Sequence, residues 1–228
     1  MKKTIVFLFA LVFIYSCTPQ DAPNTFTDSR DGKVYKTVTI GEQVWMAENL
    51  AYLPSVVGPA TESYTDPYYY VYGYDGTSVA TAKATTNYQT YGVLYNWPAA
   101  LSACPPGWHL PSDAEWKQLE MYLGITSAQA DATGWRGTAE GGKLKEEGTT
   151  HWDSPNTGAT NTSGFTALPG GVRGGGRFAS IGIGGIRWSS TEDITEAAWA
   201  RTLTYDTSLV YRGTFLKANG YSVRCLRD

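Results

Sequence analysis

Three cysteines carry the most distinctive chemistry in this sequence, at positions 17, 104 and 225. Cys17 follows an apolar leader, so two cysteines remain in the body of the chain. In an oxidising compartment a single pair allows one connectivity, and we expect a Cys104–Cys225 disulfide. The alternatives are a reactive thiol and a metal-binding pair. The sequence has two histidines and no Cys-x-x-Cys, so the usual ligand spacing of a zinc site is missing and no metal site is expected.

The two histidines are the candidates for acid–base chemistry. His109 lies just before a segment that is typical of a helix start, and His151-Trp152-Asp153 combines an imidazole with a carboxylate. We expect a packed His109, with a ring nitrogen bonded to the backbone, and a loop around Trp152; catalysis or ligand binding is the alternative for each. No motif places a nucleophile beside a base. We therefore expect no catalytic residues and a protein that is not an enzyme.

Two other segments invite a comparison with ligand-binding loops. Residues 170–177 are glycine-rich but lack the Gly-Lys-Ser/Thr ending and the following helix of a phosphate loop, so a turn between strands with Arg173 and Arg177 as exposed donors is expected. Calcium prefers about six to eight oxygen ligands. Oxygen-bearing side chains gather near 191–196, and Asp153 with Asn156 forms a second group, but neither follows a known calcium motif. We expect no cofactor, with calcium as the alternative.

Aromatic residues give the best indication of binding. Residues 64–86, which we expect to form a long, partly ordered loop, contain six of the sixteen tyrosines. Sugars bind to flat ring faces, and tyrosine and tryptophan also dominate protein interfaces. Simple packing of the tyrosine segment is the alternative. We expect ligand contacts from this segment and from the loops near 170–196, through Tyr68, Tyr70, Tyr72, Arg173, Arg177, Trp188 and Glu192.

The N-terminal residues predict export and lipid attachment. Lys2 and Lys3 precede an apolar stretch over residues 4–14, which at about 1.5 Å per residue spans only about half of a bilayer core. This pattern is typical of a signal peptide over residues 1–16. Ile14-Tyr15-Ser16-Cys17 is similar to a bacterial lipobox, so we expect Cys17 to carry lipid, with ordinary secretion as the alternative. Residues 17–27 contain two prolines and are expected to form a flexible tether.

Composition and patterning indicate one α+β domain over residues 28–228. Charged residues make up 17% and aromatics 14% of the chain, which excludes a disordered protein, and a net charge of −3 gives no reason to expect a nucleic-acid partner. We expect a hairpin over 34–47, because residues 34–40 alternate with a period of two, as is typical of a strand. We also expect two helices, at 98–103 and 112–123, with a shorter helical piece over 139–146. The second helix begins with the capping box Ser112-Asp113-Ala114-Glu115. The expected strands then follow at 165–168, 176–180, 186–189, 197–203, 208–211 and 220–226.

Several blocks carry a family resemblance. They include Trp45-Met46-Ala47-Glu48-Asn49-Leu50, Tyr91–Trp97, Cys104–Pro111, Gly164–Gly171 and Gly220–Asp228, and they span about 31–228 in order. Together they resemble the Fibrobacter succinogenes major paralogous domain family. The resemblance implies exported, often lipidated proteins and a fold related to C-type lectin-like domains, with paired terminal strands and a long loop region for binding. It implies no established enzymatic activity.

These expectations combine into one interpretation. We expect a non-catalytic lipoprotein of the cell envelope, anchored in the outer membrane through lipid on Cys17. Its lectin-like domain, with two helices, a mainly antiparallel twisted sheet and many long loops, is expected to bind glycan or another surface partner. The alternative is a structural or assembly subunit of a surface complex without a soluble ligand.

Overall fold

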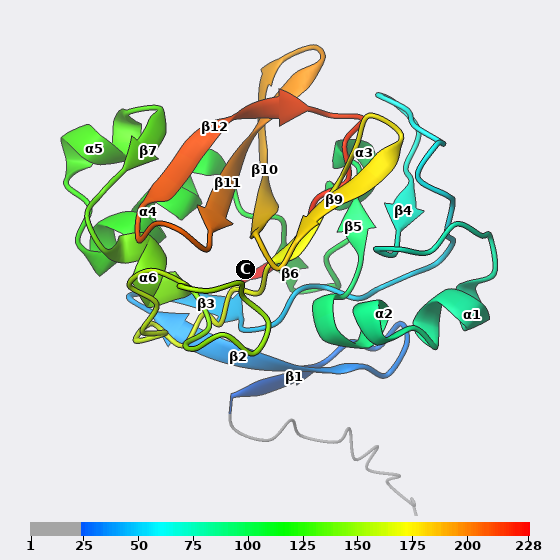
Figure 1. The fold of residues 1–228 in the computed structure, drawn as a ribbon, viewed down its shortest axis with the longest axis horizontal. Coiled ribbons are helices and arrows are strands. Elements are labelled where there is room, and N and C mark those ends of the chain that lie inside the picture. The colour runs from blue at the N-terminus through cyan, green and yellow to red at the C-terminus, as the bar shows by residue number, and fades with distance from the viewer. Residues whose placement is uncertain (1–23) are drawn as a thin grey trace, which may run out of the picture.

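A computed structural model describes residues 24–228 of the chain (Figure 1). The expected signal peptide and Cys17 lie outside these residues. The six helices of the described part are α1 (Val79–Lys83), α2 (Thr86–Tyr91), α3 (Trp97–Ala100), α4 (Asp113–Leu123), α5 (Ser127–Asp131) and α6 (Glu140–Leu144). The first seven strands are β1 (Thr25–Thr27), β2 (Val34–Ile40), β3 (Gln43–Met46), β4 (Tyr69–Tyr70), β5 (Leu94–Tyr95), β6 (Trp108–His109) and β7 (Gly134–Arg136). The remaining strands are β8 (Gly170–Gly174), β9 (Arg177–Ile181), β10 (Gly184–Ile194), β11 (Ala197–Thr204), β12 (Val210–Leu216) and β13 (Leu226–Arg227).

The strands form two main sheets and a small one. A five-stranded sheet has the order β1-β2-β3-β13-β6, and a six-stranded sheet has the order β7-β12-β11-β10-β8-β9, while β4 pairs with β5. Most pairs are antiparallel, but β10 and β8 are parallel. The last strand, β13, lies between β3 and β6, so the C-terminal segment is hydrogen-bonded to the N-terminal hairpin. This arrangement confirms the α+β class.

The expected disulfide is present. Cys104 and Cys225 are joined with a Cα–Cα distance of 5.8 Å across a sequence separation of 121 residues. Cys225 immediately precedes β13 and is fully buried in the core. The bond therefore ties the C-terminal segment to the turn that follows α3.

Helix α4 forms for the reasons that its sequence predicts. The Ser112 side chain accepts a hydrogen bond from the Glu115 amide, and the Glu115 carboxylate accepts one from the Ser112 amide, so the capping box is complete. Trp116, Leu119 and Leu123 are buried on one face, and the helix ends before Gly124, whose φ of 126° suits a glycine. The buried face packs on the six-stranded sheet.

Two apolar cores result, one on each face of the six-stranded sheet. Trp188, Ala198 and Ala200 belong to the first core, together with Tyr95, Tyr221 and the disulfide. Leu203 and Val210 point to the opposite face, where the second core contains the apolar stripe of α4 and Trp152. Within residues 24–228, no helix combines the length and the hydrophobicity that are needed to cross a membrane.

The structure corrects several expectations about elements. Residues 64–86 are not one long loop, since they contain β4, α1 and the first residue of α2. Helices as short as α1, which Ser78 caps at its N-terminus, contain too few residues to show an apolar periodicity in the sequence. The segment 165–168 forms an isolated bridge at Ala167 and no strand. Residues 25–27, expected in the tether, pair with β2 as β1.

Candidate functional site

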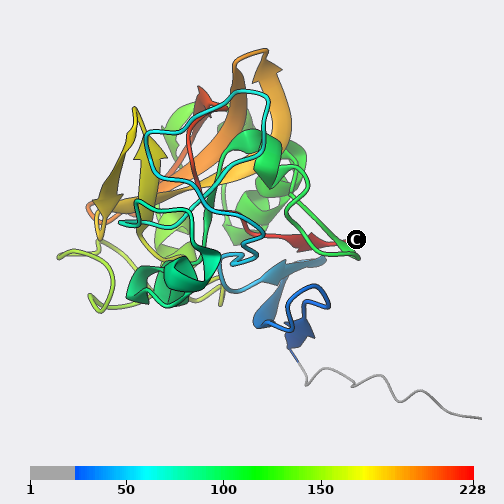
Figure 2. The ribbon, with the colours of Figure 1, turned by 90° about the vertical axis from the view of Figure 1, so that its right-hand side faces the viewer.

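The tyrosine segment and the β8–β9 hairpin lie side by side, and together they form the candidate binding surface. Figures 1 and 2 show the chain around β4 next to this hairpin. The Tyr72 and Phe178 rings have a centroid distance of 5.2 Å, and Arg173 on β8 donates to the Pro59 carbonyl at 2.7 Å. Residues more than 100 positions apart in the sequence are thus packed against one another.

Asn96, a fully buried side chain, holds the tyrosine segment in place. Its amide nitrogen donates to the carbonyls of Ser63 at 3.0 Å and Asp66 at 2.7 Å. Its carboxamide oxygen accepts from the Tyr68 amide at 2.8 Å and from the Ala99 amide as the cap of α3. One side chain therefore fixes the entry into the tyrosine segment relative to the core.

Three of the expected contact residues are buried and cannot touch a ligand on the surface. Arg173, expected as an exposed donor, is fully buried, stacks on Tyr70 at 5.1 Å and donates to the carbonyls of Pro59 and Ala218. Tyr70 is also buried, and its hydroxyl donates to the Thr61 carbonyl at 2.8 Å. Trp188 lies in the core against Tyr221. These residues support the surface from below.

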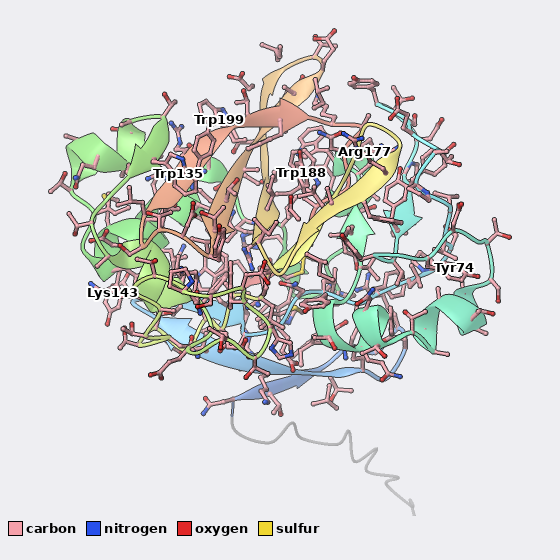
Figure 3. The ribbon with its side chains drawn as sticks, in the orientation of Figure 1. Tyr74, Trp135, Lys143, Arg177, Trp188 and Trp199 are labelled. Atoms are coloured by element: carbon pink, nitrogen blue, oxygen red, sulfur yellow. A yellow bond between two sulfur atoms is a disulfide. The ribbon has the colours of Figure 1, made fainter. Side chains whose placement is uncertain are left out.

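The other expected contact residues reach solvent. Tyr68 and Tyr72 are partly exposed, and Arg177 is exposed near the turn of the β8–β9 hairpin. Figure 3 labels Arg177 there, and Tyr74 on the loop that follows the tyrosine run. Glu192 is exposed but forms an ion pair at 3.1 Å with Lys217, which also donates to the Thr195 carbonyl. The candidate surface therefore consists of Tyr68, Tyr72, Arg177 and Phe178.

The histidines have mainly carboxylate partners. His109 is half-exposed, and its Nδ1 and Nε2 lie 2.6 Å from Asp228 and 2.9 Å from Glu115. Burial lowers the pKa of His109, but the hydrogen bonds to both carboxylates outweigh this effect and raise the pKa overall. His151 Nδ1 contacts Glu146 at 2.8 Å. The expected backbone partner of His109 is therefore wrong, because the side-chain carboxylates of Asp228 and Glu115 occupy the two ring nitrogens instead.

Metal-ligand side chains do not converge in the part of the chain that the structure describes. Residues 24–228 contain no group of three or more histidine, cysteine, aspartate or glutamate side chains that could hold a metal ion. Thr191, expected near a calcium group, instead accepts a hydrogen bond from the Asp113 amide at 2.9 Å at the start of α4. Asn156 donates to the carbonyls of Glu146 and Gly148.

A cavity of about 520 Å³ opens elsewhere in the molecule, and sequence reasoning missed it. It lies between β2, the residues after β3, α2 and the loop around 164–168. In Figure 1, β1 and β2 run beneath α2 and the loop that follows α6. Polar side chains line it, among them Lys36, Glu48 and Gln89. These residues come from three separate parts of the chain. Glu48 lies in one of the blocks that carry the family resemblance, but no pattern in the sequence brings it together with Lys36 and Gln89.

Comparison with known proteins gives one positive result. No match was found among curated proteins or among solved structures. The family model described as the Fibrobacter succinogenes major domain matches residues 38–227, which include the end of β2, strand β3, both disulfide cysteines and every residue of the candidate surface. The chain therefore belongs to the Fibrobacter succinogenes major domain family.

Proposed function

We propose that this protein is a non-catalytic, lipid-anchored component of the cell envelope that binds glycan through its tyrosine segment and β8–β9 hairpin. The observation that carries the proposal is the contact between these two segments. The Tyr72–Phe178 ring pair lies beside the exposed Arg177, which offers a hydrogen-bond donor. Ring faces together with fixed donors are the features that bind sugars.

The fold supports this role, and we propose that it is related to C-type lectin-like domains. The C-terminal strand β13 pairs with β3 of the N-terminal hairpin, and the disulfide closes the intervening chain. The candidate surface is supported by buried side chains, because Arg173 and Asn96 fix its two segments by hydrogen bonds to backbone carbonyls. A rigid surface of this kind loses little conformational entropy when it binds. Lipid on Cys17 would hold the domain at the outer membrane.

A glycan array tests the proposal. We expect selective binding by the wild-type protein that falls at least about tenfold in Tyr72→Ala and in Arg177→Ala, as is typical for central contact residues. Tyr122→Ala is the matched control, since Tyr122 is a well exposed tyrosine on α4, outside the surface. Each variant is checked for an unchanged thermal midpoint. An array without binding, or binding that all three variants retain equally, would reject the proposal.

A second function, as an assembly subunit, is favoured by one observation. Ile194 and Leu216 are exposed apolar residues that flank Ala197 at the end of the long β10–β11 hairpin, and apolar groups at such a tip suit a protein partner. Cross-linking in whole cells separates the two functions. Partner proteins that are lost in Ile194→Asp, together with an empty array, would favour assembly over glycan binding.

A further inference from the structure

The 520 Å³ cavity has the size and the lining of a small-molecule site. Ligand pockets usually enclose about 300–1,000 Å³ and contain a few well-placed polar groups. The cavity is lined in part by Lys33, Lys36, Glu48, Gln89, Thr90 and Thr166. It shares no residue with the candidate glycan surface, so the two sites can be tested separately.

Two buried guanidinium groups lie behind one wall of this cavity. Arg224 is fully buried and donates to the carbonyls of Phe165 at 2.5 Å and Thr166 at 2.8 Å. Arg187 is also buried and donates to the Leu168 carbonyl at 2.9 Å, while its Nε has no hydrogen-bond partner. Thr166, Leu168 and Arg224 line the cavity. Among residues 24–228, neither arginine forms an ion pair.

Positive charge accumulates on this side of the cavity, because neither arginine forms an ion pair among residues 24–228 and the Glu48 carboxylate offsets the charge of Arg224 only in part. Burial lowers the pKa of Arg187 to about 10, and burial together with the charge of Arg187 lowers that of Arg224. A buried cation without a counter-ion destabilises the folded protein, and charges interact more strongly where water is excluded. An anion that enters the cavity would offset this cost. The structure therefore favours a negatively charged ligand.

The side chains nearer to solvent also favour a negatively charged ligand. Lys33 and Lys36 contribute two further cations, and neither has an ion-pair partner in the described part of the chain. Two carboxylates oppose them, but both are engaged. Glu146 directs its two oxygens to His151 Nδ1 at 2.9 and 2.8 Å, and Glu48 Oε2 accepts the Lys36 amide at 3.0 Å. Cationic groups therefore outnumber the carboxylates in and behind the cavity wall.

The remaining lining groups indicate a ligand that carries hydroxyls as well as charge. The side-chain amide of Gln89 and the hydroxyls of Thr37 and Thr90 have no hydrogen-bond partner within residues 24–228. A bare inorganic anion would use neither these groups nor most of the volume. A pyranose ring would fill the space, and its hydroxyls would bond to the amide, the threonine hydroxyls and the free oxygen of Glu48.

We infer that this cavity binds an acidic sugar, in which the carboxylate lies towards Lys33, Lys36 and the Arg224 wall. The inference adds a second site to the proposed glycan-binding function and names the chemical class of its ligand. It does not depend on the tyrosine surface, because no residue is shared between the two sites.

Calorimetric titration of the full chain with glucuronate, galacturonate and the neutral sugars glucose and galactose tests the inference. We expect both uronates to bind at low salt, the neutral sugars to bind at least about tenfold more weakly, and the uronate Kd to rise with ionic strength. The double variant Lys33→Gln/Lys36→Gln should raise the uronate Kd about tenfold, because both lysine cations that attract the carboxylate are removed. Thr90→Trp, which fills the cavity from α2, should abolish binding.

The control variant is Lys117→Gln, which removes a lysine on α4 that pairs with Asp131 away from the cavity. Its uronate Kd should equal that of the wild type. Three results would overturn the inference: no uronate binding, equal binding of neutral sugars, or an unchanged Kd in both cavity variants. Inorganic phosphate that displaces uronate at equal concentration would also overturn it. Tyr72→Ala should retain uronate binding, so failure of the glycan surface and failure of the cavity are distinguishable.

Discussion

A buried charge network joins α4 to the six-stranded sheet, and Glu120 is its centre. The Glu120 carboxylate is fully buried and accepts hydrogen bonds from Arg136 Nη1 and Nη2 at 2.7 and 2.8 Å and from Arg201 Nε at 2.6 Å. Arg201 also donates to Asp113 at 2.8 Å, and Arg212 donates twice to the same carboxylate. The network connects α4 with β7, β11 and β12. We expect Glu120→Gln to disrupt the attachments to β7 and β11, which run through Arg136 and Arg201.

The magnitude follows from what Glu120→Gln changes. The substitution keeps the shape of the side chain, but its NH₂ group faces guanidinium donors, and the negative charge is lost. Arg136 then loses its carboxylate partner, and Arg201 is left to share the carboxylate of Asp113 with Arg212. Breaking one partner of a buried ion pair costs about 3–5 kcal/mol. We expect a loss of that size in the free energy of unfolding, which is a large fraction of the total for a domain.

Urea denaturation followed by tryptophan fluorescence measures this loss. Glu42→Gln is the matched control, because Glu42 is exposed and should change the free energy of unfolding by less than about 0.5 kcal/mol. In a double-mutant cycle, Arg136→Met together with Glu120→Gln should lose less than the sum of the single variants, since the two residues share their hydrogen bonds. A loss below about 1 kcal/mol for Glu120→Gln would refute the reasoning.

Two further predictions concern the C-terminal segment. Cys104→Ala/Cys225→Ala should lower the free energy of unfolding by about 5 kcal/mol, the chain-entropy value for this loop, and a urea titration that finds less than about 1 kcal/mol would contradict it. The pKa of His109 is raised in the folded state, so protonated His109 adds to the free energy of unfolding. This stabilisation is complete below the unfolded pKa of 6.5 and is lost as the pH rises through the pKa of the folded protein. Thermal midpoints of wild type and His109→Asn should therefore converge at alkaline pH, and a constant difference would exclude this linkage.

Local signals predicted the elements that depend on few neighbours. The capping box, the apolar stripe and Gly124 define α4, and alternation over residues 34–40 defines β2 with the same bounds as in the structure. The disulfide was predictable because only one pairing was left. The extent of strand β10 was harder to predict. The expected strand over residues 186–189 covers a part with mostly buried side chains, whereas β10 continues through bulges to Ile194, where the side chains are exposed.

The candidate site was predictable only in part, because burial depends on tertiary contacts. Arg173 and Arg177 lie four residues apart in a glycine-rich segment, yet one is buried and the other exposed. The difference arises because Arg173 faces Tyr70 and the Pro59 carbonyl, which come from a distant segment. No property of residues 170–177 contains that information. The cavity was even less predictable from the sequence, because Arg187 and Arg224, the two arginines behind its wall, come close together only in the folded protein.

The same buried arginines explain why the two proposed sites differ in kind. Arg173 has carbonyl partners and an ion pair with Glu62, so its charge is compensated and its role is to support the tyrosine segment above it. Arg187 and Arg224 donate to backbone carbonyls, Arg224 also donates to the Asn49 side chain, and Glu48 offsets the charge of Arg224 only in part. Their remaining charge is left to act on whatever occupies the neighbouring cavity. A compensated cation stabilises a surface that a neutral ligand can use, whereas an uncompensated one favours an anion. Whether a buried arginine supports a surface or attracts an anion thus depends on a carboxylate within ion-pair distance, which Arg173 has in Glu62 and which Arg187 and Arg224 lack among residues 24–228.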